Sequence, residues 1–418
     1  MAKIVKIYAR EILDSRANPT IETAVYLDSG HQGKCSVPSG ASSSKYEACE
    51  LRDNDPNRFA GMGVLKAVNH VNQIIAPKVI GLDSSCQTKL DQLLINLDAT
   101  PNKSNLGANA LLSISIAALK AGAAYYCLPV YQYIAKKYGL SKNLTRMPGP
   151  TFNIINGGAH GAGNLDFQEF HVIPSARFSY RQALQIGIEI YHSLKKTLKV
   201  RGAIHSVGDE GGFAPNLFTN LDALELIVDS INQTAYKFTQ DVFLGLDVSA
   251  GFFFKNNQYQ IKDRAQPFSR DELIAYYQQL NQEYHLFSLE DGLDQDDWEG
   301  WTKLTDALDS STLIVGDDLL STNKERVKKA ITAKACNAIL IKPNQIGTVS
   351  ETIEVIKYSQ ENDLKIIVSH RSGETNDTFI ADLAVGIGAD YTKFGAPARG
   401  ERIVKYNRLL EIETELKL

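Results

Sequence analysis

Six ionisable residues stand at the ends of short apolar runs in the second half of this 418-residue chain. A run of branched apolar residues is typical of a strand buried on both faces. Three acids, two amines and an imidazole at equivalent strand ends could together bind a cation and transfer protons. The residues and their runs are Asp247 in FLGLD, Glu290 in HLFSLE, Asp317 in LIVGD, Lys342 in AILIK, His370 in KIIVSH and Lys393 in DYTK.

The three acids indicate a metal site. Oxygen ligands without cysteine or histidine favour a hard divalent cation such as Mg²⁺. Each acid could instead cap the helix that follows its strand, but capping explains each acid separately and does not explain their recurrence. We therefore expect Asp247, Glu290 and Asp317 to share one cation.

The two lysines indicate a base. Lys342 alone could simply extend from a strand end to solvent. With Lys393 and a metal nearby, repulsion is expected to lower the pKa of at least one of them, leaving a neutral amine near pH 7. Schiff-base chemistry is the alternative, but it leaves the three acids without a role. Proton abstraction beside a metal-bound carboxylate accounts for both sets of residues.

Three further segments carry candidate site residues. Alone, the first two are an acidic turn and a glycine-rich loop, and neither matches a phosphate-binding GxGxxG or GxxxxGK pattern. Arginine and serine directly after a strand end suit a phosphate or a carboxylate. The segments are SVGDEGGFAPN with Glu210, NIINGGAHGAGNLDFQEF with Gln168 and Glu169, and VSHRSGETNDT with Arg371 and Ser372.

The repeated pattern predicts the element order that must position these residues. The charged strand ends lie 23 to 43 residues apart, and amphipathic helical segments separate them. Six or more such units predict a closed parallel barrel of the (β/α)8 type, with the site at the C-terminal ends of its strands. Capping boxes are predicted at Ser269 with Glu272, Thr322 with Glu325, and Thr348 with Glu351.

The first third of the chain differs from the rest. Residues 3–37 alternate apolar and polar side chains, as in antiparallel strands, and residues 59–138 show helical spacing. SKNLTRMPGP interrupts both patterns. We predict an α+β capping domain over residues 1–140 with a mobile active-site loop, and an α/β barrel catalytic domain over residues 141–418.

Composition narrows the function classes. The net charge of -4 arises from 48 acids and 44 bases mixed along the chain, so no nucleic-acid partner is expected. Five scattered cysteines favour a reducing cytoplasm over a disulfide framework or a zinc site. The apolar stretch 106–135 is interrupted by Asn109, Lys120 and Pro129, which favours a buried helix pair over a membrane span.

The motifs VGDEGG, LEDGLDQDDWEGW, VGDDL, KPNQIGT and SHRSGET, in this order, resemble the enolase family, the phosphopyruvate hydratases of glycolysis. The likeness runs from EILDSRANPT to GAPARGER. It implies a hydro-lyase that reversibly converts 2-phosphoglycerate to phosphoenolpyruvate, with two Mg²⁺ per active site, the second arriving with substrate. It also implies that Lys342 removes the C2 proton, and that Glu210, hydrogen-bonded with Glu169, protonates the departing C3 hydroxyl.

The resemblance assigns the other site residues as well. The catalytic set is Glu210, Lys342, Glu169, His370 and Lys393; the metal set is Asp247, Glu290, Asp317 and, for the second ion, Ser39; the substrate set is His160, Gln168, Glu169, Glu290, Asp317, Arg371, Ser372 and Lys393. The family usually has Thr-Gly where this chain has Ser43-Ser44. Loss of that glycine is expected to slow closure of the loop and to leave Ser39 in place.

The resemblance further implies a homodimer or octamer and, beside the cytoplasmic protein, a surface or secreted pool that binds host plasminogen through lysines. Lys417 is not the terminal residue, which weakens that route. A racemase or lactone-forming relative would leave Glu210, Ser39 and the Arg371–Ser372 pair without a purpose. An inactive structural relative would have no reason to keep the metal acids and both lysines.

Overall fold

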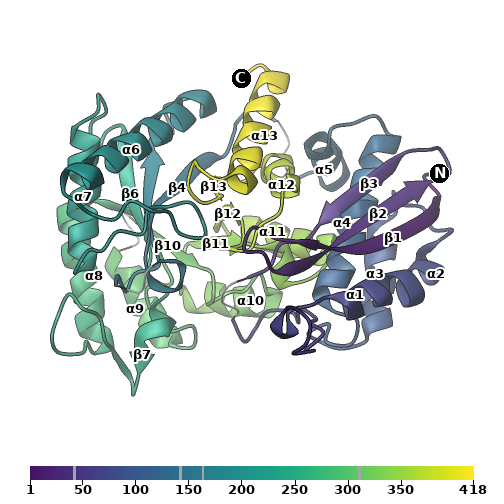
Figure 1. Cartoon of the computed structure of the whole chain (residues 1–418), viewed down its shortest axis with the longest axis horizontal. Helices are drawn as coiled ribbons and strands as arrows, with labels where there is room; N and C mark the ends of the chain where they lie inside the picture. The colour runs from purple at the N-terminus through teal and green to yellow at the C-terminus, as the bar shows by residue number, and fades with distance from the viewer. Residues whose placement is uncertain (41–43, 141–143, 162–163, 309–311) are drawn as a thin grey trace.

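The structure is a computed structural model that describes residues 1–40, 44–140, 144–161, 164–308 and 312–418. An N-terminal α+β part lies beside a barrel, and the barrel helices α10, α11 and α12 are on the side facing it (Figure 1). The predicted boundary at 140/141 adjoins residues 141–143, which lie outside the described residues.

The N-terminal part is an antiparallel sheet with helices against it, as the alternating pattern predicts. Its strands, in the order β1-β2-β3, are β1 (Ile4–Leu13), β2 (Pro19–Leu27) and β3 (Gln32–Ser36). A Cβ on Gly33 of β3 would lie 2.1 Å from the carbonyl oxygen of Ala117, a residue of helix α4 (Ala108–Tyr125). The close approach of α4 to β3 therefore requires glycine. The helical elements are η1 (Phe59–Gly61), α1 (Leu65–Asn69), η2 (His70–Ile75), α2 (Ala76–Val79), α3 (Gln87–Asp98), α4 (Ala108–Tyr125) and α5 (Val130–Tyr138).

Helix α4 is the central helix of this part. Among the described helices it is long and apolar enough to cross a membrane, yet 83% of it is buried inside the protein. Such burial is typical of a core helix, and α4 with α5 forms the predicted helix pair.

Eight strands close the barrel in the order β10-β11-β12-β13-β4-β5-β6-β9. Their side chains alternate between the barrel interior and the surrounding helices, which explains their continuous apolar sequences. The strands are β4 (Gly149–Asn156), β5 (Glu169–Pro174), β6 (Val242–Asp247), β9 (Leu286–Glu290), β10 (Leu313–Gly316), β11 (Ala338–Ile341), β12 (Lys365–Ser369) and β13 (Tyr391–Lys393).

The prediction of an all-parallel barrel is wrong at one strand. β5 runs antiparallel to both β4 and β6. The described part of the β4–β5 connection contains a short 3-10 turn, η3 (Gly158–His160), where a parallel crossover would need a helix. Because β5 is reversed, its first residue, Glu169, pairs with Asp247, the last residue of β6.

Helices cover the outside of the barrel, and α6 and α7 both lie between β5 and β6 in sequence. The helices are α6 (Tyr180–Val200), α7 (Asn220–Asn232), α8 (Arg270–Tyr284), α9 (Trp298–Leu308), α10 (Lys324–Ala333), α11 (Val349–Glu361), α12 (Phe379–Ile387) and α13 (Gly400–Leu416). The smaller elements are η4 (Ala250–Phe253), β7 (Phe254–Lys255), β8 (Gln258–Tyr259) and η5 (Pro343–Gln345).

Of the three predicted capping boxes, the one at Ser269 is confirmed in full, and the one at Thr348 only in part, because no hydrogen bond from the Thr348 backbone to the Glu351 side chain is found among the described residues. The Ser269 and Thr348 side chains accept hydrogen bonds from the third helical residue. The Thr322 cap is wrong, because Asn323 caps α10. The Thr322 hydroxyl instead accepts a hydrogen bond from the Lys342 backbone at 3.0 Å and thereby holds the end of β11.

Largely buried polar contacts join the two parts of the molecule. Lys120 of α4 pairs with Asp377 at 2.6 Å, and the same carboxylate accepts a bond from the Ser36 backbone. Burial raises the pKa of Asp377, but Lys120 and the backbone donors of Ser36 and Phe379 together bring it below its ordinary value. Asp91 of α3 accepts a bond from the Ser350 backbone at 2.8 Å.

Replacing Lys120 by methionine should destabilise the protein by about 3–5 kcal/mol, because Asp377 would keep a largely buried charge without its cation. The midpoint of urea unfolding measures the change in stability. Lys324→Met is the matched control, since its partner Glu354 is 57% exposed and the cost there should stay below about 1 kcal/mol. Equal midpoints for the two variants would contradict the structural role of the buried pair.

Candidate active site

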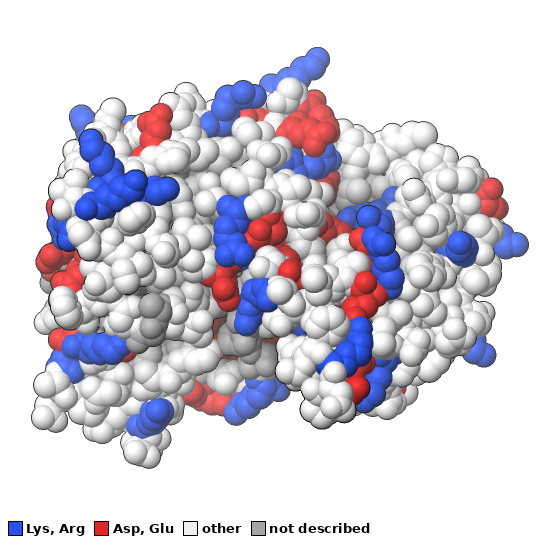
Figure 2. Space-filling view, in the orientation of Figure 1, with Lys and Arg blue, Asp and Glu red and all other residues white. Residues whose placement is uncertain are grey.

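All six predicted strand-end residues lie at one mouth of the barrel. Asp247, Glu290 and Lys393 end their strands. Asp317, Lys342 and His370 directly follow theirs. Figure 2 shows acidic and basic side chains in the middle of the face that it views, between the barrel and the N-terminal part.

Lys393 lies within a group of buried carboxylates. Its Nζ is 2.9 Å from Asp247 Oδ2 and 2.9 Å from both oxygens of Glu290. Glu169 Oε1 lies 3.3 Å away. Burial raises the pKa of Glu290, and the neighbouring Asp247 raises it further, to well above its ordinary value. Asp247 and Glu290, two of the three predicted metal ligands, thus both contact the ammonium group of Lys393.

The third acid, Asp317, pairs with the other lysine, Lys342. Its second oxygen accepts a hydrogen bond from Gln345 Nε2 at 3.1 Å. The lowered lysine pKa was predicted for a mouth that holds a metal ion, and it stays a prediction. Burial lowers the pKa of Lys342, as do Arg371 and Lys393, but the neighbouring carboxylates, Asp317 first, bring it above its ordinary value while no cation competes for them. The pKa of Lys393 is raised in the same way.

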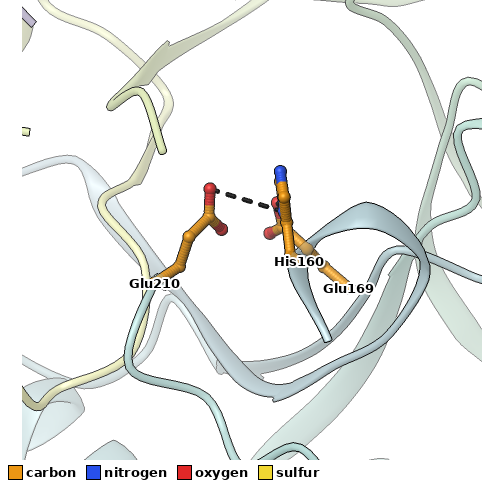
Figure 3. Close-up of side chains that lie close together, drawn as sticks. All are labelled: His160, Glu169 and Glu210. Carbon is orange, nitrogen blue, oxygen red and sulfur yellow. Dashed lines mark ion pairs between the residues drawn. The ribbon is translucent and has the colours of Figure 1, made fainter. Parts of the chain in front are cut away.

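A second group of ionisable side chains faces the lysines. His160 Nδ1 lies 3.5 Å from Glu169 Oε1 and 3.5 Å from Glu210 Oε1, so the imidazole stands between the two carboxylates (Figure 3). Among the described residues no hydrogen bond joins Glu169 directly to Glu210; such a bond needs one of the two carboxyls to be protonated, so it stays a prediction. Each acid also has its own further contacts, including His171 Nε2 at 2.9 Å from Glu169 Oε2.

Glu210 is surrounded by donors. Ser372 Oγ donates to Glu210 Oε1 and Asn153 Nδ2 donates to Glu210 Oε2, both at 3.0 Å. Burial and Glu169 raise the pKa of Glu210, but His160 and His370 lower it by more, so it lies below the ordinary value. These surroundings therefore favour the anionic form of Glu210.

His370 has a defined tautomer. The Arg402 guanidinium donates to His370 Nδ1 at 2.6 Å, and a guanidinium cannot accept. The ring proton consequently lies on Nε2, which is 3.5 Å from Glu210 Oε2. Burial, together with Arg402, keeps the pKa of His370 below its ordinary value.

The predicted phosphate ligands occupy one side of the mouth. Arg371 forms a two-point ion pair with Glu47, at 2.9 and 3.3 Å. Ser39 pairs through its backbone with Gly373, and its hydroxyl donates to Asp14 at 2.5 Å. Ser39 thus lies beside the Arg371–Ser372 segment, while its hydroxyl is bonded away from the carboxylates of the mouth.

A cavity of about 20 Å³ lies among these side chains, with room for roughly one water molecule. Glu290 and Ser39 do not line this cavity. Glu290 instead contacts Lys393, which does line it. The predicted residues in the lining are His160, Gln168, Glu169, Glu210, Asp247, Asp317, Lys342, His370, Arg371, Ser372 and Lys393.

Several site residues were missed by sequence reasoning. Asp291 and Asp318 lie close to Asp317, with carboxylate oxygens within 4.8 Å of one another. Burial and Asp317 raise the pKa of Asp318 to about 7. The doubled acids in LEDG and GDDL were the available signal. Glu47 lies in an irregular segment, and nothing in the sequence indicates its contact with Arg371.

The structure describes one of the two residues of the predicted loop change. Ser43 lies outside the described residues. Ser44 is buried, and its hydroxyl donates to Gln295 Oε1 at 2.7 Å, a contact that glycine could not make. The adjacent Lys45 pairs with Asp296 at 2.6 Å. Side chains of residues 44 and 45 thus attach the base of this loop to the segment after β9.

The fold and mouth define a barrel enzyme suited to proton transfer on a small anionic molecule. Residues 144–417 match the family described as enolase, C-terminal TIM barrel domain, and residues 4–134 match the enolase N-terminal domain. The chain therefore belongs to the enolase family. Matches to both domains indicate a lyase, a phosphopyruvate hydratase, and the family uses a divalent metal, which agrees with the buried acidic cluster.

Proposed function

We propose that the protein catalyses the Mg²⁺-dependent, reversible dehydration of 2-phosphoglycerate to phosphoenolpyruvate. The observation that carries this proposal is the cavity at the mouth, which is lined both by the amine of Lys342 and by the carboxylate of Glu210. One group can remove a proton from carbon while the other assists loss of a hydroxyl.

The residues present fit a bound divalent cation. Asp247, Glu290, Asp317 and Glu169 are buried around two lysines, so the carboxylates outnumber the ammonium groups. Asp247, Glu290 and Asp317 would hold the first ion, and Ser39 would contribute to the second, which enters with substrate. A bound cation supplies positive charge that stabilises a substrate carboxylate as negative charge develops on it.

Lys342 acts first in the proposed reaction. Its neutral amine takes the C2 proton, and the electron pair of the C–H bond passes to C2 and into the adjacent carboxylate. When the acids of the mouth are shared with a cation, Lys342 loses part of the attraction that raises its pKa. The ammonium of Lys393 adds positive charge at the same place.

Glu210 acts in the second step. The electron pair on C2 forms the C2–C3 double bond as the C3–O bond breaks, and the departing oxygen takes a proton from Glu210 to leave as water. Because His160 and His370 favour the anion of Glu210, the carboxylate has to gain a proton before this step.

The phosphate would bind at Arg371 and Ser372. Arg371 already holds a carboxylate in a two-point arrangement, which is also the geometry of arginine–phosphate pairs. The phosphate would therefore replace Glu47 as the partner of Arg371, and Glu47 would move outward with its segment.

The assay is formation of phosphoenolpyruvate from 2-phosphoglycerate, followed by its ultraviolet absorbance, with and without Mg²⁺. The absorbance should rise only when 2-phosphoglycerate and Mg²⁺ are both present. Glycerate, which lacks the phosphate, should give no product. Inactivity on 2-phosphoglycerate, with proton exchange on another carboxylate, would favour the racemase alternative.

Replacing Ser44 by glycine should loosen the base of the loop, because the bond to Gln295 is lost. A hydrogen bond of this kind corresponds to about a five-fold change in rate. We expect kcat to rise by up to about five-fold, as measured by steady-state kinetics. Ser29→Gly, in the exposed turn between β2 and β3, is the matched control and should leave kcat unchanged. A fall in kcat for Ser44→Gly would contradict this role.

The dimer or octamer, the cytoplasmic location, and the surface or secreted pool that binds plasminogen stay predictions. Light scattering of the purified protein tests the first of them.

A further inference from the structure

Asn153 is a fully buried polar residue in β4 that contacts Glu210. It is 0% exposed, and its Nδ2 donates to Glu210 Oε2 at 3.0 Å. A break in the β4–β5 register follows it, between Asn153 and Ile155. The residue therefore holds the carboxylate from the barrel wall, on a rigid element.

The other atom of the same amide is unusual. Asn153 Oδ1 is buried and has no hydrogen-bond partner within the described structure. An orphaned acceptor calls for an explanation, and a use in another state of the protein would supply one. Its position in the amide places it one half-turn from the bond to Glu210.

The surroundings of Glu210 show what that use is. Ser372 donates to one oxygen, and His370 presents its Nε2 proton toward the other. His160 and Glu169 are the remaining ionisable groups that face it. These donors suit the anion. Among the described residues the contacts of Oε2 are donors, Asn153 Nδ2 and His370 Nε2, so a proton carried on Oε2 needs an acceptor at that oxygen.

We propose that Asn153 is the positioning residue of Glu210 in both of its protonation states, an inference that rests on the proposed function. Its NH2 group holds the anion, and after a half-turn of the amide its carbonyl accepts the hydrogen bond of the protonated carboxyl. The two ends of the amide are nearly equal in size, so the turn needs no repacking.

This role separates the two halves of the reaction. Asn153 contacts Glu210, and no hydrogen bond joins it to Lys342 among the described residues. Loss of Asn153 should therefore slow breaking of the C3–O bond and spare removal of the C2 proton. A merely structural residue would weaken both halves equally.

The test compares two rates for the Mg²⁺-loaded enzyme: phosphoenolpyruvate formation, and exchange of the C2 hydrogen of 2-phosphoglycerate in D2O, followed by NMR. Asn153→Ala should lower the first by about 10- to 100-fold and change the second by less than about three-fold. Asn156→Ala is the matched control, because Asn156 is as deeply buried in β4 and makes no hydrogen bond to Glu210 in the described structure. It should leave the ratio of the two rates unchanged.

Asn153→Asp provides the second variant and decides the matter if the alanine protein does not fold. It keeps an acceptor, loses the donor and adds negative charge, so it should raise the pKa of Glu210 and move the limb of the dehydration pH profile to higher pH. Equal losses of both rates in Asn153→Ala, or an unmoved profile in Asn153→Asp, would overturn the inference. Absence of both reactions in the unmodified protein would instead overturn the proposed function.

Discussion

Lys342→Ala should lower phosphoenolpyruvate formation by about 100- to 10,000-fold, the contribution of a well-placed proton-transfer group. The same variant should lose exchange of the C2 hydrogen. The other described lysine that lines the cavity, Lys393, is held by three carboxylates, whereas Lys342 would be released when Asp317 binds a cation. Assays of both rates at saturating Mg²⁺ measure the effect.

Glu210→Gln is the contrasting variant. It cannot release a proton to the departing hydroxyl, but it leaves Lys342 intact, so C2 exchange should persist while dehydration falls. Turnover retained in Lys342→Ala, or exchange lost in both variants, would contradict the assignment of base and acid.

Removing divalent metal with a chelator should abolish turnover, and Mg²⁺ should restore it. Mg²⁺ at about 100 times its Kd should also stabilise the protein by roughly 2.7 kcal/mol, because it binds only the folded mouth. The expected physical cause is relief of repulsion among buried carboxylates, which is expressed in the raised pKa of Glu290. Thermal unfolding with and without Mg²⁺ measures this stabilisation.

Glu290→Gln should lose both the turnover and most of the Mg²⁺-induced rise in melting temperature. The matched control is Glu354→Gln, since Glu354 is an exposed acid of α11 and should keep the full response. Chelator-treated protein with unchanged activity and an unchanged melting temperature would refute the metal requirement.

The location of the site was predictable, whereas its internal pairing was not. A charge that ends an apolar run marks a strand end, and the ends of parallel strands meet at one rim of a barrel. The sequence holds no information on which lysine contacts which acid, and the sign of the Lys342 pKa shift depends on that distance. Thr322 and Asn323 are both good caps, so only backbone geometry decides between them.

Two residues show where further signal was available or absent. Asn153 is a polar residue inside the apolar run PTFNIIN, and a buried polar residue in a strand calls for a specific partner. Glu47 is one of many charges in an irregular segment, and its bond to Arg371 spans 324 positions. Long-range pairing of this kind follows from the docking of the two domains, which local patterns do not encode.

The reversed strand β5 has a wider consequence for how the rim is built. An ordinary strand–helix unit brings a single strand terminus to the reactive end of a barrel, whereas the hairpin-like return from β4 brings two, Asn156 and Glu169, from neighbouring positions. Inserting a crossover helix there would direct Glu169 to the opposite end of the molecule. An attempt to regularise this barrel into eight identical units should therefore yield a well-folded protein that lacks one wall of its reaction chamber.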